Sequence, residues 1–167
     1  MIHYPAAPFV SKLRLGGIIS HRDSEEITMP KEITLRSKGF NPFGDLIGLN
    51  FVKCADGYSQ CVLEVNHQLL NPHKVLHGGV IYSMADTGMG GALYSCMEHD
   101  ELCATVEIQI IYFKAVTSGT LTCNTRVLHR TRTLAALESE IADDGGLVAK
   151  GTGTFSIFKA KKLDSHL

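Results

Sequence analysis

Asp86 is the only carboxylate or basic side chain between Gly78 and Met97, a stretch that is otherwise rich in small and apolar residues. Its sequence neighbours include Met84 and Ala85. A carboxylate among apolar groups loses hydration, and such a group persists mainly where a partner or a function compensates. Asp86 is therefore a candidate general base or nucleophile. The alternative is a structural carboxylate that a neighbouring backbone group or hydroxyl satisfies.

A second candidate lies at residues 76–79, where the sequence reads Leu-His-Gly-Gly. If a helix begins here, its first backbone N–H groups have no intrahelical partner and carry the positive end of the helix dipole. Gly78 lacks a Cβ, so a ligand can approach closely. Such donors would stabilise an oxygen that gains negative charge when a carbonyl is attacked. The alternative is that the two glycines only make a tight turn into the helix.

The spacing of the two candidates sets a geometric condition. Eight residues at a rise of ~1.5 Å each place Asp86 about 12 Å along the helix axis from Gly78, too far to serve one carbonyl easily. If two such helices lie antiparallel across a two-fold axis, Asp86 of one chain comes near Gly78 of the other, which gives two equivalent sites. The spacing therefore predicts a homodimer with shared sites.

The elements that must position these residues can be predicted from hydrophobic periodicity. Residues 78–98 show sustained helical spacing and are apolar nearly all round, which is typical of a buried helix. Strand-like segments surround it, at residues 46–53 and 58–65 with a hairpin turn at 55–57, and at 104–116, 120–129, 134–142 and 147–159. Short connections predict antiparallel meander neighbours. The expected fold class is α+β, a hotdog fold in which a curved antiparallel sheet wraps one long central helix.

Length and composition agree with one domain. The chain has 167 residues, enough for an ordinary core, and we place the hotdog domain at residues 41–159. Residues 1–40 are predicted to be an N-terminal extension of uncertain order, because short apolar pieces are broken by glycine, proline and charges. Residues 160–167 form a C-terminal tail.

Charge and cysteine usage narrow the partners and the compartment. A formal net charge of -1 offers no broad basic field, so no nucleic-acid partner is expected. The apolar runs are far shorter than the ~20 residues that span a bilayer, so we expect no membrane partner. Five cysteines without a CxxC pair indicate reduced thiols in a cytoplasmic protein.

Four features occur in a fixed order: Asn71, the Leu-His-Gly-Gly sequence at 76–79, Met84-Ala85-Asp86, and Thr105 before an apolar strand. Their combined spacing resembles the PaaI-type hotdog thioesterases, the family named for phenylacetate degradation. The resemblance runs from about residue 41 to residue 158.

The resemblance implies an acyl-CoA thioesterase, which hydrolyses an acyl-CoA to a free acid and coenzyme A. No metal or organic cofactor is expected, because the sequence has no ligand cluster and no phosphate-binding glycine loop followed by a helix. Asp86 matches the catalytic carboxylate and Gly78 the oxyanion donor, with Asn71 and His77 as the polar groups beside it. Thr105 takes the place of a hydroxyl residue that helps to hold the attacking water. In the family, Asn71, His77 and Gly78 would come from one chain and Asp86 and Thr105 from the other, and dimers commonly pair into homotetramers.

A basic turn contains His129, Arg130 and Arg132, which could contact coenzyme A phosphates or could be a solvated hairpin tip. Thr131 stands where the family commonly has glycine, which puts the local coenzyme A contacts in question. His73 and His77 have the spacing of a metal pair, but no third ligand is evident, so no metal is expected.

Two other functions remain as alternatives. The same fold hosts acyl-CoA hydratases, but the Asp-containing loop typical of that chemistry is not visible in this sequence. A non-catalytic acyl-CoA sensor would need a segment that reads DNA or a protein, and residues 1–40 show no helix-turn-helix pattern or basic face.

Overall fold

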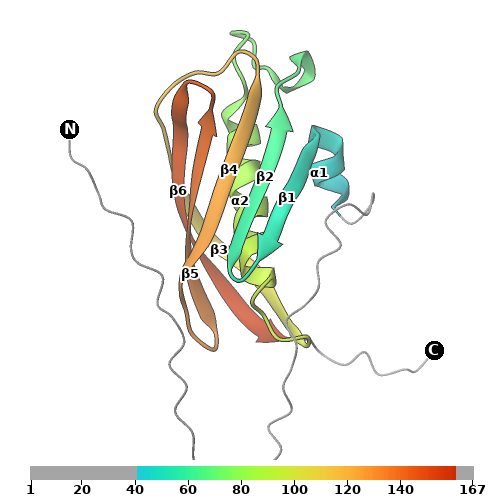
Figure 1. Ribbon diagram of the computed structural model, residues 1–167, viewed down its shortest axis with the longest axis vertical. Coiled ribbons are helices and arrows are strands. Elements are labelled where there is room, and N and C mark those ends of the chain that lie inside the picture. Colours follow the sequence, from blue (N-terminus) through green and yellow to red (C-terminus); the bar gives the residue numbers. More distant parts are fainter. Residues whose placement is uncertain (1–40, 161–167) are drawn as a thin grey trace, which may run out of the picture.

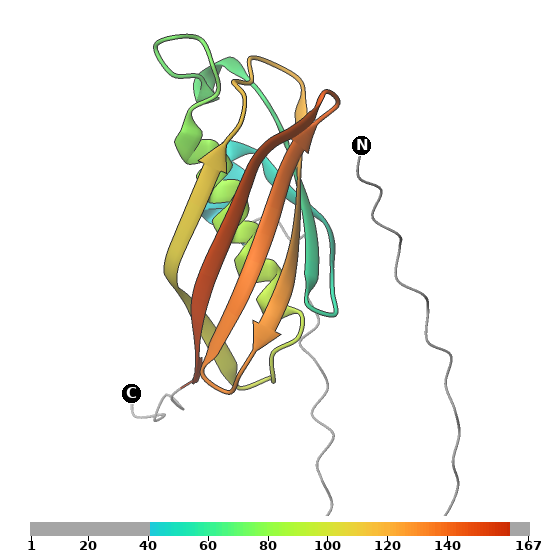
Figure 2. The same ribbon diagram turned by 90° about the vertical axis from the view of Figure 1, so that its left-hand side faces the viewer.

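A six-stranded antiparallel sheet curls around one long helix (Figures 1 and 2). The computed structural model describes residues 41–160, so the predicted N-terminal extension and residues 161–167 lie outside the described residues. The elements in chain order are α1 (Pro42–Ile47), β1 (Leu49–Ala55), β2 (Tyr58–Glu64), the 3-10 helix η1 (His67–Leu69), α2 (Gly78–Tyr94), β3 (Glu101–Tyr112), β4 (Thr120–Arg130), β5 (Leu134–Asp143) and β6 (Gly146–Lys159). This is the predicted α+β hotdog fold.

The central helix α2 contacts all six strands and forms the middle of the core. It begins where predicted, because His77 caps it: the His77 Nδ1 accepts a hydrogen bond from the Gly79 N–H at 2.9 Å. It ends at Tyr94 rather than at residue 98. Ser95 takes the C-cap position, where its hydroxyl donates to the Ala92 carbonyl at 2.7 Å and accepts the Gly57 N–H at 3.0 Å. The first hairpin turn therefore holds the end of the helix.

Small side chains let α2 approach the sheet closely at Gly88. The Ser59 hydroxyl on β2 donates to the Gly88 carbonyl at 2.7 Å, which ties the helix backbone directly to a strand. A Cβ at residue 88 would lie 2.6 Å from Thr125 Oγ1, and this hydroxyl is itself bonded to Ser139 Oγ at 2.7 Å. The contact therefore depends on glycine at this position.

The first predicted strand was wrong at its start. Residues 46 and 47 belong to α1, and β1 begins at Leu49. Local capping decides this: the Asn41 side chain accepts from the Gly44 N–H at 3.0 Å, and Gly48 ends the helix with a left-handed φ of 76°. The hairpin after β1 is confirmed, with positive φ at Asp56 and Gly57 as a tight primed turn requires.

The predicted meander was wrong for β3. The strand order is β1-β2-β4-β5-β6-β3, so β3 pairs with β6 at the edge of the sheet, and β2 pairs with β4. The burial of the side chains explains why β4 pairs with β2 instead of β3. Cys61 and Leu63 on β2 face Cys123 and Leu121 on β4, and all four are buried. Most β3 side chains are exposed instead, which suits an edge position.

The contact at Gly88 can be tested against Gly90, two residues further along α2. Both substitutions to alanine gain up to ~1 kcal/mol of helix propensity, so that gain cancels between them. Gly88→Ala should lower the free energy of unfolding by about 1–3 kcal/mol, because the fixed Thr125 must give way. A Cβ at residue 90 would meet no atom within 4 Å outside its own helix turn, so Gly90→Ala should not lower the free energy of unfolding. Urea unfolding measures both, and equal midpoints would contradict the proposed rigidity at Gly88.

Candidate active site

Asp86 and Thr105 are joined by a hydrogen bond. The Thr105 hydroxyl on β3 donates to Asp86 Oδ1 at 2.7 Å, and within residues 41–160 the other carboxylate oxygen of Asp86 has no hydrogen-bond partner. The carboxylate is half-buried rather than enclosed, because Met84 and Ala85 turn into the core and Asp86 turns away from it. One oxygen is thus held by a hydroxyl and the other can accept a proton.

The start of α2 presents a backbone donor at Gly78. The Gly79 N–H is used by His77 Nδ1 and the Val80 N–H by the His77 carbonyl, both at 2.9 Å. Gly78 is the first residue of the helix, so its N–H has no intrahelical acceptor. His77 Nδ1 acts as an acceptor, which assigns the ring proton of the neutral imidazole to Nε2. Gly78 and His77 therefore place two donors at one helix end.

Tyr112 covers Gly78 from the end of β3, and no sequence pattern predicted this contact. The Tyr112 hydroxyl donates to the Gly78 carbonyl at 3.1 Å, and a Cβ at residue 78 would lie 3.5 Å from the ring. Burial, and then the nearby Tyr82, raise the pKa of Tyr112, which keeps the phenol protonated as a donor. Tyr112 lies 34 residues along the chain from Gly78, and only the sheet brings them together.

Asn71 shapes the loop that leads into α2. Its side-chain oxygen accepts the His73 N–H at 2.9 Å and the Val75 N–H at 3.4 Å, and its own N–H donates to the Val75 carbonyl at 2.8 Å. The His77 N–H donates to the Leu69 carbonyl at 2.9 Å, which fixes the loop beside the helix start. In this arrangement the Asn71 side-chain NH₂ is the part of the amide that a ligand could use.

The predicted residues therefore form two groups within one chain. Asn71, His77 and Gly78 lie at the start of α2. Asp86 lies about 12 Å further along the same helix, with Thr105 of β3 beside it.

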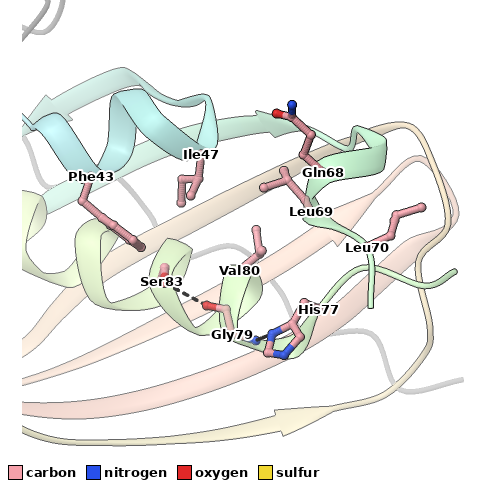
Figure 3. A pocket seen from close by; sticks show the side chains of 9 residues that line it. All are labelled: Phe43, Ile47, Gln68, Leu69, Leu70, His77, Gly79, Val80 and Ser83. Atoms are coloured by element: carbon pink, nitrogen blue, oxygen red, sulfur yellow. Dashed lines mark hydrogen bonds between the residues drawn. The ribbon is translucent and has the colours of Figure 1, made fainter. Parts of the chain in front are cut away.

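Two cavities flank the first turn of α2. The first, with a volume of about 430 Å³, lies between α1, η1 and α2 (Figure 3). The second, of about 360 Å³, lies between the first turn of α2 and the chain that follows β3, and its lining includes Gly78, Tyr112 and Lys114. The two donors at the helix start thus lie beside space for a ligand.

Comparison with known proteins identifies the family of this chain. A family model described as "Thioesterase superfamily" matches residues 73–150. The solved structure of conserved protein PA5202 from Pseudomonas aeruginosa is 37% identical, with a TM-score of 0.68, and the match covers 70% of this chain and 93% of that chain. The chain belongs to the thioesterase superfamily. Its match to family members makes it a thioester hydrolase in general terms.

Two named relatives extend this picture. A "putative esterase" from Saccharolobus solfataricus is 27% identical over 74% of this chain and 82% of its own length. The acyl-coenzyme A thioesterase PaaI from Escherichia coli is 26% identical over 58% of this chain and 68% of its own length. The PaaI-type resemblance predicted from short motifs is confirmed.

In this thioesterase-superfamily chain the basic turn is built differently from a free hairpin tip. Arg130 forms an ion pair with Glu101, whose side chain is only 7% exposed, and the Glu101 Oε2 also accepts the Glu98 N–H at 2.8 Å. His129 and Arg132 are exposed. Arg130 therefore joins the end of β4 to the start of β3. Its Nη2 is used by Glu101, while its buried Nε has no hydrogen-bond partner in the described part of the chain.

Thr131 replaces the glycine common in the family without a left-handed backbone. The residues other than glycine with positive φ in the described chain are Asp56 and Lys74. The Thr131 hydroxyl accepts the Leu134 N–H and donates to the Leu134 carbonyl, each at 3.0 Å. The side chain thus closes the turn itself.

The remaining candidate chemistry is absent from the described part of the chain. None of the five cysteines forms a disulfide, and burial raises the pKa of the Cys54 thiol to about 11, which disfavours the thiolate nucleophile at that position. No group of three or more metal-ligating side chains occurs in residues 41–160, so His73 and His77 lack a third ligand there. Over the same residues, no helix combines the length and the apolar character that crossing a bilayer requires.

The role of Arg130 can be separated from that of Arg132. Arg130→Met should lower the free energy of unfolding by about 1–3 kcal/mol, because it removes the arginine that pairs with the buried Glu101 carboxylate, while the partial exposure of Arg130 reduces the loss. Arg132→Met, at an exposed position of the same turn, should change it by less than about 0.5 kcal/mol. Thermal or urea unfolding decides, and equal effects would show that the ion pair adds no stability.

Proposed function

We propose that the protein hydrolyses an acyl-CoA thioester to a free acid and coenzyme A, in a site that two chains share. The observation that carries this proposal is the bond from Thr105 to Asp86, which orients a carboxylate with one open oxygen on the helix that begins with the Gly78 donor. The name of the Escherichia coli relative, an acyl-coenzyme A thioesterase, supports the substrate class.

The proposed site assigns each residue a step. The thioester carbonyl oxygen accepts the Gly78 N–H, and negative charge that develops on it is stabilised by that donor and by the helix dipole. His77 and the NH₂ of Asn71 hold the substrate beside it. Thr105 donates to Asp86 and can accept from a water, so the water lies next to the open carboxylate oxygen.

Bond changes then follow in one of two ways. As a general base, Asp86 takes a proton from the water while the water oxygen attacks the carbonyl carbon; the C–S bond breaks as the intermediate collapses, and the proton passes to the coenzyme A sulfur. As a nucleophile, Asp86 attacks the carbonyl carbon and expels the thiolate, and water then hydrolyses the resulting anhydride. The geometry is compatible with both.

Edge strand β3 supports the shared site. It pairs with β6 on one side only, and its exposed side chains include Val106 at 60% and Ile111 at 63%. A long edge strand with apolar side chains is a ready surface for pairing with a second chain. A two-fold axis beside β3 and α2 would bring Asp86 of one chain near the partner subunit's Gly78, which removes the 12 Å separation.

The same arrangement would give the basic turn a place near the substrate. Within one chain the turn between β4 and β5, which follows His129 and contains Arg132, lies at the end of the molecule where α2 finishes, away from the start of α2 (Figure 1). In an antiparallel pair of chains, His129 and Arg132 would lie at the same end of the dimer as the partner subunit's Gly78. We include His129 and Arg132 as contacts for the coenzyme A phosphates, and Arg130 as the residue that positions their turn. Pairing of dimers into a homotetramer and a cytoplasmic location belong to the same proposal.

The carboxylate can be tested by Asp86→Asn, which keeps the shape and loses the basicity. Turnover of acyl-CoA should fall by roughly 100-fold or more, with folding and acyl-CoA binding largely kept. Asp144→Asn, at an exposed carboxylate in the turn between β5 and β6, serves as the matched control and should leave the rate unchanged. Free-thiol release measures the rate, and an Asp86→Asn enzyme within a few-fold of the wild type would exclude this carboxylate.

Mixing two inactive variants tests the shared site. Asp86→Asn is combined with Asn71→Asp, which keeps the oxygen that holds the loop but loses the NH₂. If the sites are shared, a mixed dimer has one site with both lesions and one with neither. Random exchange makes half of the dimers mixed, so about a quarter of the wild-type activity should return.

Subunit exchange is checked by mass spectrometry of differently labelled chains. A sample that exchanges fully and stays as inactive as its parents would place Asp86 and Asn71 in one chain's site.

A further inference from the structure

The cavity between α1, η1 and α2 has an apolar wall and an open side. Phe43 and Ile47 reach down from α1 toward the first turns of α2, where Val80 and Ser83 lie (Figure 3). Leu69 of η1 adds a third apolar side. Phe43 is 52% exposed, so its ring stands at the boundary between the cavity and solvent.

The polar end of this cavity is the helix start that carries the proposed oxyanion donor. His77 and Gly79 both line the cavity, and Gly78 lies between them. Gly78 itself lines the second cavity, so a thioester whose carbonyl oxygen accepts the Gly78 N–H lies between the two cavities, and its acyl group can enter either one. The hydrogen bonds of Gly79 to His77 and of Ser83 to the Gly79 carbonyl hold this end in place (Figure 3).

The lining residues indicate the chemical class of the occupant. Among the nine described side chains around the cavity there is no Asp, Glu, Lys or Arg. A volume of about 430 Å³ lies at the small end of ligand pockets, which run from ~300 to ~1,000 Å³. The space therefore suits an uncharged acyl group of medium length or one with a single aromatic ring.

The second cavity is less suited to an alkyl chain. Its lining includes Lys114, whose ammonium group pairs with Asp143 at 2.6 Å, and the hydroxyl of Tyr112 that bonds to Gly78. An alkyl chain there would remove water from these polar groups without replacing their hydrogen bonds.

We propose that the cavity bounded by Phe43, Ile47, Leu69 and Val80 binds the acyl group of the substrate, and that Phe43 sets the longest acyl chain that fits. This inference rests on the proposed thioester hydrolysis and names its substrate class: uncharged medium-chain or aryl acyl-CoA. An acyl group that ends in a carboxylate is disfavoured, because the described lining of the cavity has no lysine or arginine to pair with it.

The test measures binding without turnover. Calorimetry on the full-length protein gives the affinity of S-alkyl thioethers of coenzyme A, which cannot be hydrolysed, from acetyl-length to palmitoyl-length chains. The affinity should rise about fourfold per methylene while the chain enters the cavity, and should stop rising once the cavity is full. In the wild type, an analogue with a terminal carboxylate should bind at least about tenfold more weakly than the alkyl analogue of equal length.

Variants at Phe43 and Phe113 test which of the two cavities binds the acyl group. Phe43→Ala should increase the alkyl-chain length at which the affinity stops rising, and Phe43→Trp should decrease it. Phe113→Ala is the matched control, because Phe113 is 54% exposed and lines the other cavity, and it should leave the profile unchanged. A shift with Phe113→Ala but not with the Phe43 variants, or no shift with any of them, would overturn the proposal.

Hydrolysis of the corresponding thioesters is measured separately. If the wild type hydrolyses none of them, the proposed function fails, while the binding profile still decides the acyl subsite.

Discussion

Burial of α2 against the curved sheet is the contact on which the rest of the structure depends. The helix contacts every strand, and at Gly88 its backbone comes close enough to accept a hydrogen bond from Ser59. Close packing of this kind fixes the rotation of the helix about its axis. Because Met84 and Ala85 face the core, Asp86 points to the side of the helix, where Thr105 of the edge strand β3 reaches it. The direction of the candidate carboxylate is thus a consequence of core packing.

The same packing gives the two ends of α2 different tasks. Its first turn is capped by the His77 ring and is covered by Tyr112, which leaves the Gly78 N–H as the unused donor. Its last turn is held by Ser95, which also binds the first hairpin. Beyond it, the ion pair between Glu101 and Arg130 joins β3 to β4 across the end of the sheet. The first turn of α2 can therefore bind a ligand, while the contacts beyond its last turn hold the strands together at the other end of the sheet.

The sequence predicted those features that local patterns determine. The helix start at Gly78 and the turn at Asp56-Gly57 were predictable, because caps, periodicity and positive φ are set by a few neighbouring residues. The place of β3 at the sheet edge was not, since strand pairing depends on which distant faces share a core. The Tyr112 bond to Gly78 and the Glu101 pair with Arg130 were missed for the same reason. The pairing of Thr105 with Asp86 was reached only through the family resemblance.

The pairing of β2 with β4 has a consequence for the order of folding. Ser59 lies opposite Thr125, and the whole of α2 and β3 separates these two strands along the chain. During synthesis the first hairpin and α2 leave the ribosome before β4 exists, so the apolar face of the helix has only two strands to cover it. Pairings between distant segments form slowly, because the entropy of closing the loop is lost before the contacts are made. Folding of this chain must therefore wait for its second half, and the nascent first half is the stage at which exposed apolar surface is greatest.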